Sequence, residues 1–75
     1  DLASSAEFER RLFSEMERLP EKLRVVLALA GVEGYDTREV ARLLEIPEGT
    51  VKSRLHAARK ELAKRLKWIV NDTKT

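Results

Sequence analysis

Apolar residues recur at helical spacing along most of this chain. The first such set is Phe8, Leu12, Met16 and Leu19. Steps of three or four positions predict a helix that ends at Leu19, and Ser4 with Glu7 has the spacing of a capping box at its start. The small, polar stretch 1–7 is interpreted as a linker tail.

A second apolar stretch follows at once, with the sequence PEKLRVVLALA over residues 20–30. Pro20 suits the first turn of a helix, where its missing N–H has no partner to lose. From Val25 to Ala30 the stretch is apolar almost all round, which predicts a central helix or one that a partner covers on its second side. Gly31 and Gly34 are predicted to end it.

Two further helices are predicted on either side of a tight turn. In the third, Asp36 and Glu39 form a second capping box, and Pro47 stops the helix. The fourth begins near Pro47 or Glu48 and is long. Its apolar stripe is Val51, Leu55, Ala58, Leu62, Leu66 and Ile69.

The chain has no strand pattern, so we predict an all-α fold of four helices. A short third helix, a tight turn and a longer fourth helix form a helix-turn-helix. Ala41 is small enough to let the two helices cross closely, and Ile46 is the apolar residue beneath the turn. The predicted domain covers residues 8–70, and 71–75 is a C-terminal tail.

With 75 residues the chain is long enough for one small domain. It has no cysteine, and 37% of its residues are charged. Neither a long apolar run nor a signal peptide is present, so no membrane partner is expected. Because the chain starts at Asp1 and its only methionine is Met16, we expect it to be a piece of a larger protein.

Charge is distributed unevenly between the two parts of the chain. Residues 1–48 contain seven Lys/Arg and eleven Asp/Glu, a balance of −4, whereas residues 49–75 contain eight and two, a balance of +6. Such polarity points to an acidic partner for the C-terminal part. On charge alone, a solvated helix face explains it equally well.

Helical geometry places this positive charge on one face of the fourth helix. At about 100° per residue, the apolar stripe is centred near Val51, Leu55 and Leu62. The outward face consists of Ser53, Lys60 and Lys64, with His56 and Ala57 beside them and Lys52 and Arg54 on the flanks. The second helix of a helix-turn-helix puts its N-terminal end into the major groove, where side chains reach base edges.

Enzymatic chemistry has no support in the residue inventory. No nucleophile–base pair and no glycine-rich phosphate loop are visible, and acidic residues occur singly on helix surfaces. His56 is the only histidine, so no histidine cluster exists for a metal. We therefore expect no catalytic residue, no cofactor, no metal and no small-molecule ligand.

Several short motifs are spread along the chain. The most specific is IPEGTVKSRL at residues 46–55; the others are Leu19-Pro20, Glu39-Val40-Ala41, Ala58-Arg59 and Leu62. Together they resemble region 4 of bacterial sigma factors, within the extracytoplasmic-function group of the sigma-70 family. The resemblance covers about residues 8 to 66. Two positions depart from the family pattern: Glu45 stands where the turn usually has glycine, and Ala57 stands where arginine is common.

The resemblance implies recognition of the −35 promoter element by the fourth helix, carried on RNA polymerase in the bacterial cytoplasm. The positions matching base-facing ones are Lys52, Ser53, His56 and Ala57, the last offering only a methyl group. Thr50 and Arg54 match positions beside phosphates, and Gly49 permits close approach of the backbone. The implied protein partners are the flap of the RNA polymerase β subunit and an anti-sigma factor, with the domain itself a monomer.

The roles of the remaining basic residues are each open to two interpretations. Arg59 lies close to the apolar stripe, so a structural pair with an acid of the second or third helix competes with a phosphate contact. Arg38 either meets the DNA backbone or is an ordinary surface residue, and Lys60 contributes a general field more than a specific contact. Trp68 either covers the first helix or is exposed.

Two other kinds of binding module remain as alternatives. The helix-turn-helix output domain of a response regulator shares the architecture but usually dimerises through a final helix. A pure interaction module would dock its basic helix on an acidic protein.

Overall fold

The computed structural model describes the backbone of residues 5–73 and the side-chain surroundings of residues 6–67. This part of the chain forms α1 (Ser5–Glu17), α2 (Glu21–Leu27), the π-helical segment η1 (Ala28–Val32), α3 (Thr37–Leu44) and α4 (Glu48–Thr73), with no strand. The predicted all-α fold is confirmed. The cap residue Ser4, the side chains of Trp68 and Ile69, and residues 1–4 and 74–75 of the two predicted tails lie outside the described residues. Residues 5–7 and 71–73 of those tails are helical.

The first helix ends two residues earlier than predicted, at Glu17 instead of Leu19. Proline disfavours the helical conformation in the residue before it, and Pro20 itself is extended, with a ψ of 144°. Arg24 Nη1 donates to the carbonyl oxygen of Glu17 at 3.1 Å and so pairs one of the last carbonyls of α1. Leu19 lies in the turn but is still buried in the core.

The predicted second helix is divided into α2 and η1. The amide of Glu33 donates to the carbonyl oxygen of Ala28, five residues back, at 3.0 Å, which is the spacing of a π-helix. The prediction that Gly31 ends the helix is wrong, because Gly31 lies inside η1. The chain instead turns near Gly34, whose φ of 82° favours glycine.

Helix α3 begins and ends as local chemistry requires. Asp36 Oδ1 accepts from the amide of Glu39 at 2.8 Å, and Glu39 Oε1 accepts from the amide of Asp36 at 3.0 Å. This confirms the predicted capping box. At the other end Glu45 is left-handed, with a φ of 55°, and the amide of Ile46 reaches the carbonyl oxygen of Ala41 at 3.1 Å. The turn therefore has a glycine-like backbone despite its glutamate.

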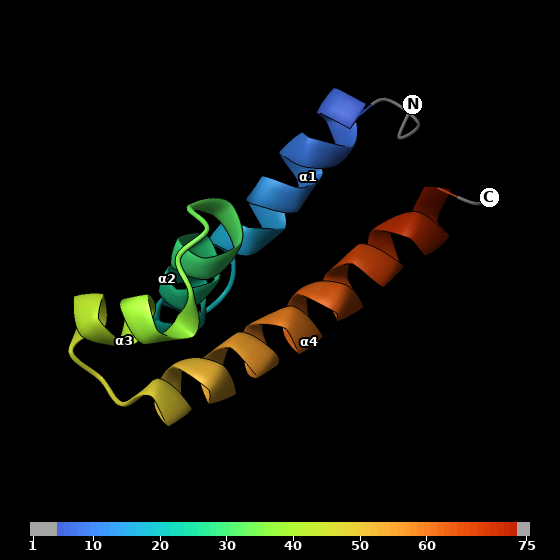
Figure 1. The fold of residues 1–75 in the computed structure, drawn as a ribbon. Helices are drawn as coiled ribbons and strands as arrows, with labels where there is room; N and C mark the ends of the chain where they lie inside the picture. The colour runs from blue at the N-terminus through green and yellow to red at the C-terminus, as the bar shows by residue number, and fades with distance from the viewer. Residues whose placement is uncertain (1–4, 74–75) are drawn as a thin grey trace.

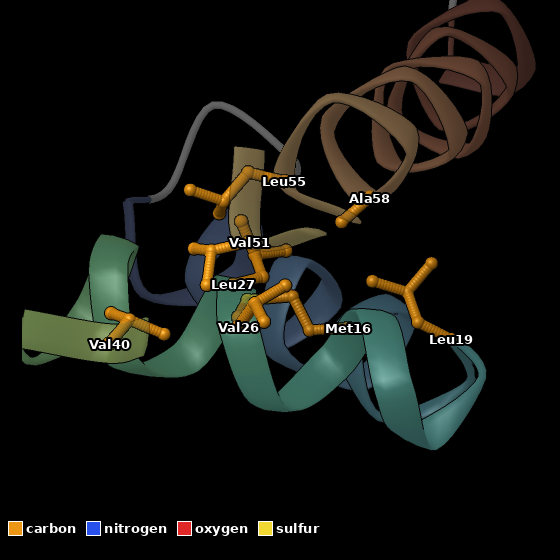
Figure 2. Packing of buried hydrophobic residues seen from close by; sticks show 8 residues of the cluster. All are labelled: Met16, Leu19, Val26, Leu27, Val40, Val51, Leu55 and Ala58. Atoms are coloured by element: carbon orange, nitrogen blue, oxygen red, sulfur yellow. The ribbon is translucent and has the colours of Figure 1, made fainter. Parts of the chain in front are cut away.

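The core draws side chains from all four α-helices and the α1–α2 turn. Its buried members are Met16, Leu19, Val26, Leu27, Val40, Val51, Leu55 and Ala58. Figure 2 shows Val51 and Leu55 of α4 packed over Val26 and Leu27 of α2. Helix α2 supplies two buried residues, Val26 and Leu27, and packs against α4. The rest of the apolar stretch 25–30 is half-buried, so the structure does not decide between a central helix and one that a partner covers on its second side.

Helix α4 sets the length of the molecule. Its 26 residues span about 39 Å at 1.5 Å per residue, and the longest dimension of the domain is 44 Å. In Figure 1 the helix-turn-helix lies at one end, where α3 meets the start of α4, and α1 runs beside the far half of α4. Arg65 Nη1 on that far half pairs with Glu15 Oε1 of α1 at 3.2 Å. The first turns of α4 are thus free on the side away from the core.

Candidate nucleic-acid interface

The outward face of α4 is solvent-exposed along its first three turns. Val51, Leu55 and Ala58 turn toward the core and are buried. The exposed candidates on this helix are Gly49, Lys52, Ser53, His56, Ala57, Arg59 and Lys60. The fold therefore presents this set together on one surface.

Three further candidates lie at the edge of that surface. Thr50 and Arg54 are half-buried, so each shows part of its side chain beside the exposed set. Arg38 is exposed in the first turn of α3, on the other helix of the helix-turn-helix. All ten candidates thus remain accessible to a ligand that approaches the start of α4.

The N-terminal end of α4 is open to close approach. The carbonyl oxygen of Pro47 accepts from the amides of Thr50 at 3.0 Å and Val51 at 3.2 Å, which begin the helical pattern. The amides of Glu48 and Gly49 precede these bonds, and such groups favour an anion. A Cβ added at Gly49 would meet nothing within 4 Å. Packing inside the domain therefore does not require glycine at this position.

Three cations of this surface have no ion-pair partner among the described residues. In the described part of the chain, Arg54, Arg59 and Lys60 take part in no ion pair, whereas Arg65 pairs with Glu15 at 3.2 Å and Glu61 at 3.6 Å. The structural pair considered for Arg59, with an acid of the second or third helix, is thus not present among these residues. The surface is suited to hold a polyanion.

One acidic residue at the interface did not emerge from the sequence. Thr37 Oγ1, in the first turn of α3, donates to Glu48 Oε2 at 2.8 Å, and Lys52 Nζ lies 3.7 Å from the same oxygen. The ion pair between Glu48 and Lys52 could have been predicted from the sequence, because oppositely charged residues four positions apart on a helix are neighbours. The contact with Thr37 is made across the turn and has no local pattern.

The described residues show neither a metal-binding cluster nor a membrane-spanning helix. They contain no group of three or more His, Cys, Asp or Glu residues that could hold a metal ion. Within the same residues, no helix has the length and apolar character needed to cross a membrane.

A second surface is apolar and lies where α1, η1 and α4 meet. It is an open groove of about 460 Å³, lined by Glu9, Leu12, Phe13, Met16, Leu27, Gly31, Val32 and Leu62. Phe13 and Val32 are about half exposed there. The π-turn of η1 brings Gly31 and Val32 to this groove, so the break in the second helix shapes it.

Comparison with known proteins identifies the family. The family model described as "Sigma-70, region 4" matches residues 9–62. The chain is 34% identical over 62 residues to the ECF RNA polymerase sigma-E factor of Haemophilus influenzae, covering 83% of this chain and 33% of the relative. It is 34% identical over 67 residues to the ECF RNA polymerase sigma factor SigW of Bacillus subtilis, covering 89% and 36%.

The sigma-E factor of Escherichia coli K12 is 31% identical over 70 residues, covering 93% of this chain and 37% of the relative. The chain thus spans about a third of the length of these relatives. The matched region contains α3, α4 as far as Leu62 and all the residues that line the apolar groove. The chain therefore belongs to the sigma-70 region 4 family and corresponds to region 4 of an extracytoplasmic-function sigma factor.

Proposed function

We propose that this domain binds the −35 element of promoter DNA through α4 and thereby directs RNA polymerase to the promoters it serves. The observation that carries the proposal is the exposed face of α4, whose cations Arg54, Arg59 and Lys60 have no ion pair in the described residues. The relatives are RNA polymerase sigma factors by name, which supports it. The function is one of positioning, without a catalytic step.

The dimensions of helix and groove are compatible. The major groove of B-DNA is about 12 Å wide, and an α-helix with its side chains is about 10–12 Å across. With the start of α4 in the groove, Lys52, Ser53 and His56 face base edges, and Ala57 offers a methyl contact to thymine. In this proposal, these four residues determine which DNA sequence the domain prefers.

Contacts to the phosphates surround the base-facing set. Gly49 and Thr50 lie at the helix start, where amide groups favour a phosphate. Arg54 adds a side chain that is always positively charged. Arg38 of α3 lies on the helix that crosses the DNA backbone in this motif. Arg59 and Lys60 extend the positive field along α4.

Replacing Lys52 with alanine is expected to cost about 1–3 kcal/mol on the preferred duplex and to relax selectivity at one base pair. Lysine donates to the two major-groove acceptors of guanine, and alanine cannot. Fluorescence anisotropy with labelled preferred and scrambled duplexes measures both affinities. Equal losses on the two duplexes would make Lys52 a phosphate contact and remove it from base recognition.

Replacing Arg54 with alanine is expected to weaken every duplex by a similar factor. The plot of log K against log salt should become less steep by about one unit, because one phosphate contact and its released counterion are lost. The same titrations at four salt concentrations measure this slope. An unchanged slope would remove Arg54 from the phosphate contacts. Lys67, exposed on a later turn of α4, is the matched position whose alanine variant should leave the slope unchanged.

Selection of bound duplexes from a random library tests the function itself. The chain is expected to enrich one short motif, and sedimentation with that duplex should show one protein molecule per site. A dimer on a two-fold repeat would favour the response-regulator alternative. Failure to bind any duplex at low salt, where phosphate attraction is strongest, would favour a pure protein-interaction module.

We also propose that the apolar groove between α1, η1 and α4 is the protein-facing surface of the domain. The flap of the RNA polymerase β subunit is its proposed occupant during initiation, and an anti-sigma factor its occupant in the regulated state, both in the bacterial cytoplasm. The exposed Phe13 and Val32 support this assignment, since apolar side chains of this kind gain most from being covered.

A further inference from the structure

We infer that Glu48 is a positioning residue that sets the selectivity of α4 by restraining Lys52. The inference rests on the proposed DNA recognition and deepens it. The carboxylate oxygen Glu48 Oε2 has two neighbours, Thr37 Oγ1 at 2.8 Å and Lys52 Nζ at 3.7 Å. One oxygen thus connects the first turn of α3, the first turn of α4 and the lysine proposed to meet a base.

Thr37 determines where the carboxylate lies. The hydrogen bond from Thr37 to Glu48 is partly buried and joins residues 11 apart in sequence. A glutamate side chain on an open helix surface samples several rotamers, but this one is held by a neighbouring helix. The negative charge therefore has a defined position at the start of α4.

Glu48 in turn limits where Lys52 reaches. The two residues are one helical turn apart, and helical side chains lean toward the N-terminus of their helix. Their side chains are 66% and 40% exposed for Lys52 and Glu48, so the ion pair is weak and can exchange for a better partner. The two acceptors of a guanine in the major groove are such a partner.

Lys52 behaves differently on a duplex that has no guanine within its reach. Lys52 then stays with Glu48 and adds little to phosphate binding, while the carboxylate repels nearby phosphates. Non-specific complexes lose one cation contact in this way, and specific complexes keep theirs. A restrained lysine thus raises the ratio of specific to non-specific affinity at the expense of total affinity.

Replacing Glu48 with glutamine tests this device. The amide oxygen of glutamine still accepts from Thr37, but the charge that holds Lys52 is gone. Affinity for a scrambled duplex is expected to rise by about two- to fivefold, the range that one exposed ion pair corresponds to. The salt slope on that duplex should steepen by about 0.9 unit, as Lys52 becomes a phosphate contact. Affinity for the preferred duplex should rise by less, so the selectivity ratio falls.

Two matched variants separate restraint from net charge. Glu33→Gln removes the same charge from an exposed residue between η1 and α3, and should leave the selectivity ratio unchanged. In a Lys52→Ala background, Glu48→Gln should change both duplexes by the same factor, because the restrained group is absent. Thr37→Val keeps the charge but releases the carboxylate, and should lower the ratio by a smaller factor, with a thermal melt to confirm folding.

The outcomes distinguish this inference from the proposed function. If the unaltered chain selects a motif but Glu48→Gln moves both duplexes equally, the inference is overturned and the proposed function stands. The same holds if the effect of Glu48→Gln persists without Lys52. If the unaltered chain binds no duplex, the proposed function fails and the inference fails with it.

Discussion

Replacing Val51 with aspartate is expected to unfold the domain. Val51 has no exposed surface and packs with core residues of α2 and α3. Burying a carboxylate without a partner costs several kcal/mol, and a domain of this size is stable by only about 5 kcal/mol. The cooperative thermal transition measured by far-ultraviolet circular dichroism at 222 nm should therefore disappear.

Two variants show whether burial of charge is the cause. Leu43→Asp makes a similar change on α3, where the side chain is 56% exposed, and should melt within a few degrees of the parent chain. Val51→Ala removes two methyl groups without adding charge and should remain folded while losing about 2 kcal/mol. A cooperative melt of Val51→Asp near that of the parent would mean that α4 does not pack as described.

The packing around Val51 also explains why the fold was readable from the sequence. The first three residues of the apolar stripe on α4, Val51, Leu55 and Ala58, are its buried face. Asp36 with Glu39 marks the start of α3 by a purely local pattern. Both signals depend on neighbours within one helical turn. Element type and order followed from them directly.

Two features of the backbone were not predicted from the sequence: the π-helical segment η1 and the left-handed conformation of Glu45. A continuous apolar run over 25–30 gave no sign that the second helix would change to π spacing at Ala28. Glu45 adopts a left-handed backbone that its side chain disfavours by about 1–2 kcal/mol, and the tight connection between α3 and α4 holds it there. Neither the π spacing of η1 nor the left-handed backbone of Glu45 has a signal in the apolar pattern of its own segment.

Some features of the candidate site could also be predicted from the sequence, and others could not. Exposure of Lys52, Ser53 and His56 followed from helical periodicity, because the buried stripe of α4 determines the opposite face. Glu48 was missed because its defining contact, with Thr37 of α3, depends on how the two helices cross. The lack of an ion pair at Arg59 in the described residues is likewise a tertiary fact. Periodicity thus predicts which face is free, and packing decides how the groups on it are held.

Replacing Ser53 with glutamate is expected to abolish DNA binding while the fold remains intact. Ser53 is exposed and lies on the side of α4 away from the buried Val51 and Leu55. A carboxylate there enters the major groove between two rows of phosphates, and such like-charge contacts cost several kcal/mol. Affinity should fall by about 100-fold or more on preferred and scrambled duplexes alike, with an unchanged melting temperature.

The control for Ser53→Glu is Ala63→Glu, which adds the same charge to an exposed position ten residues further along α4. It lies beyond the proposed contacts, so it should weaken binding by less than about threefold through the general field alone. Ser53→Ala, which adds no charge, should retain most of the affinity. If Ser53→Glu binds duplexes as well as Ala63→Glu does, the start of α4 does not enter the groove. The lysine, serine and histidine on that face would then have no bases to read, since every base contact proposed for this domain depends on that one approach.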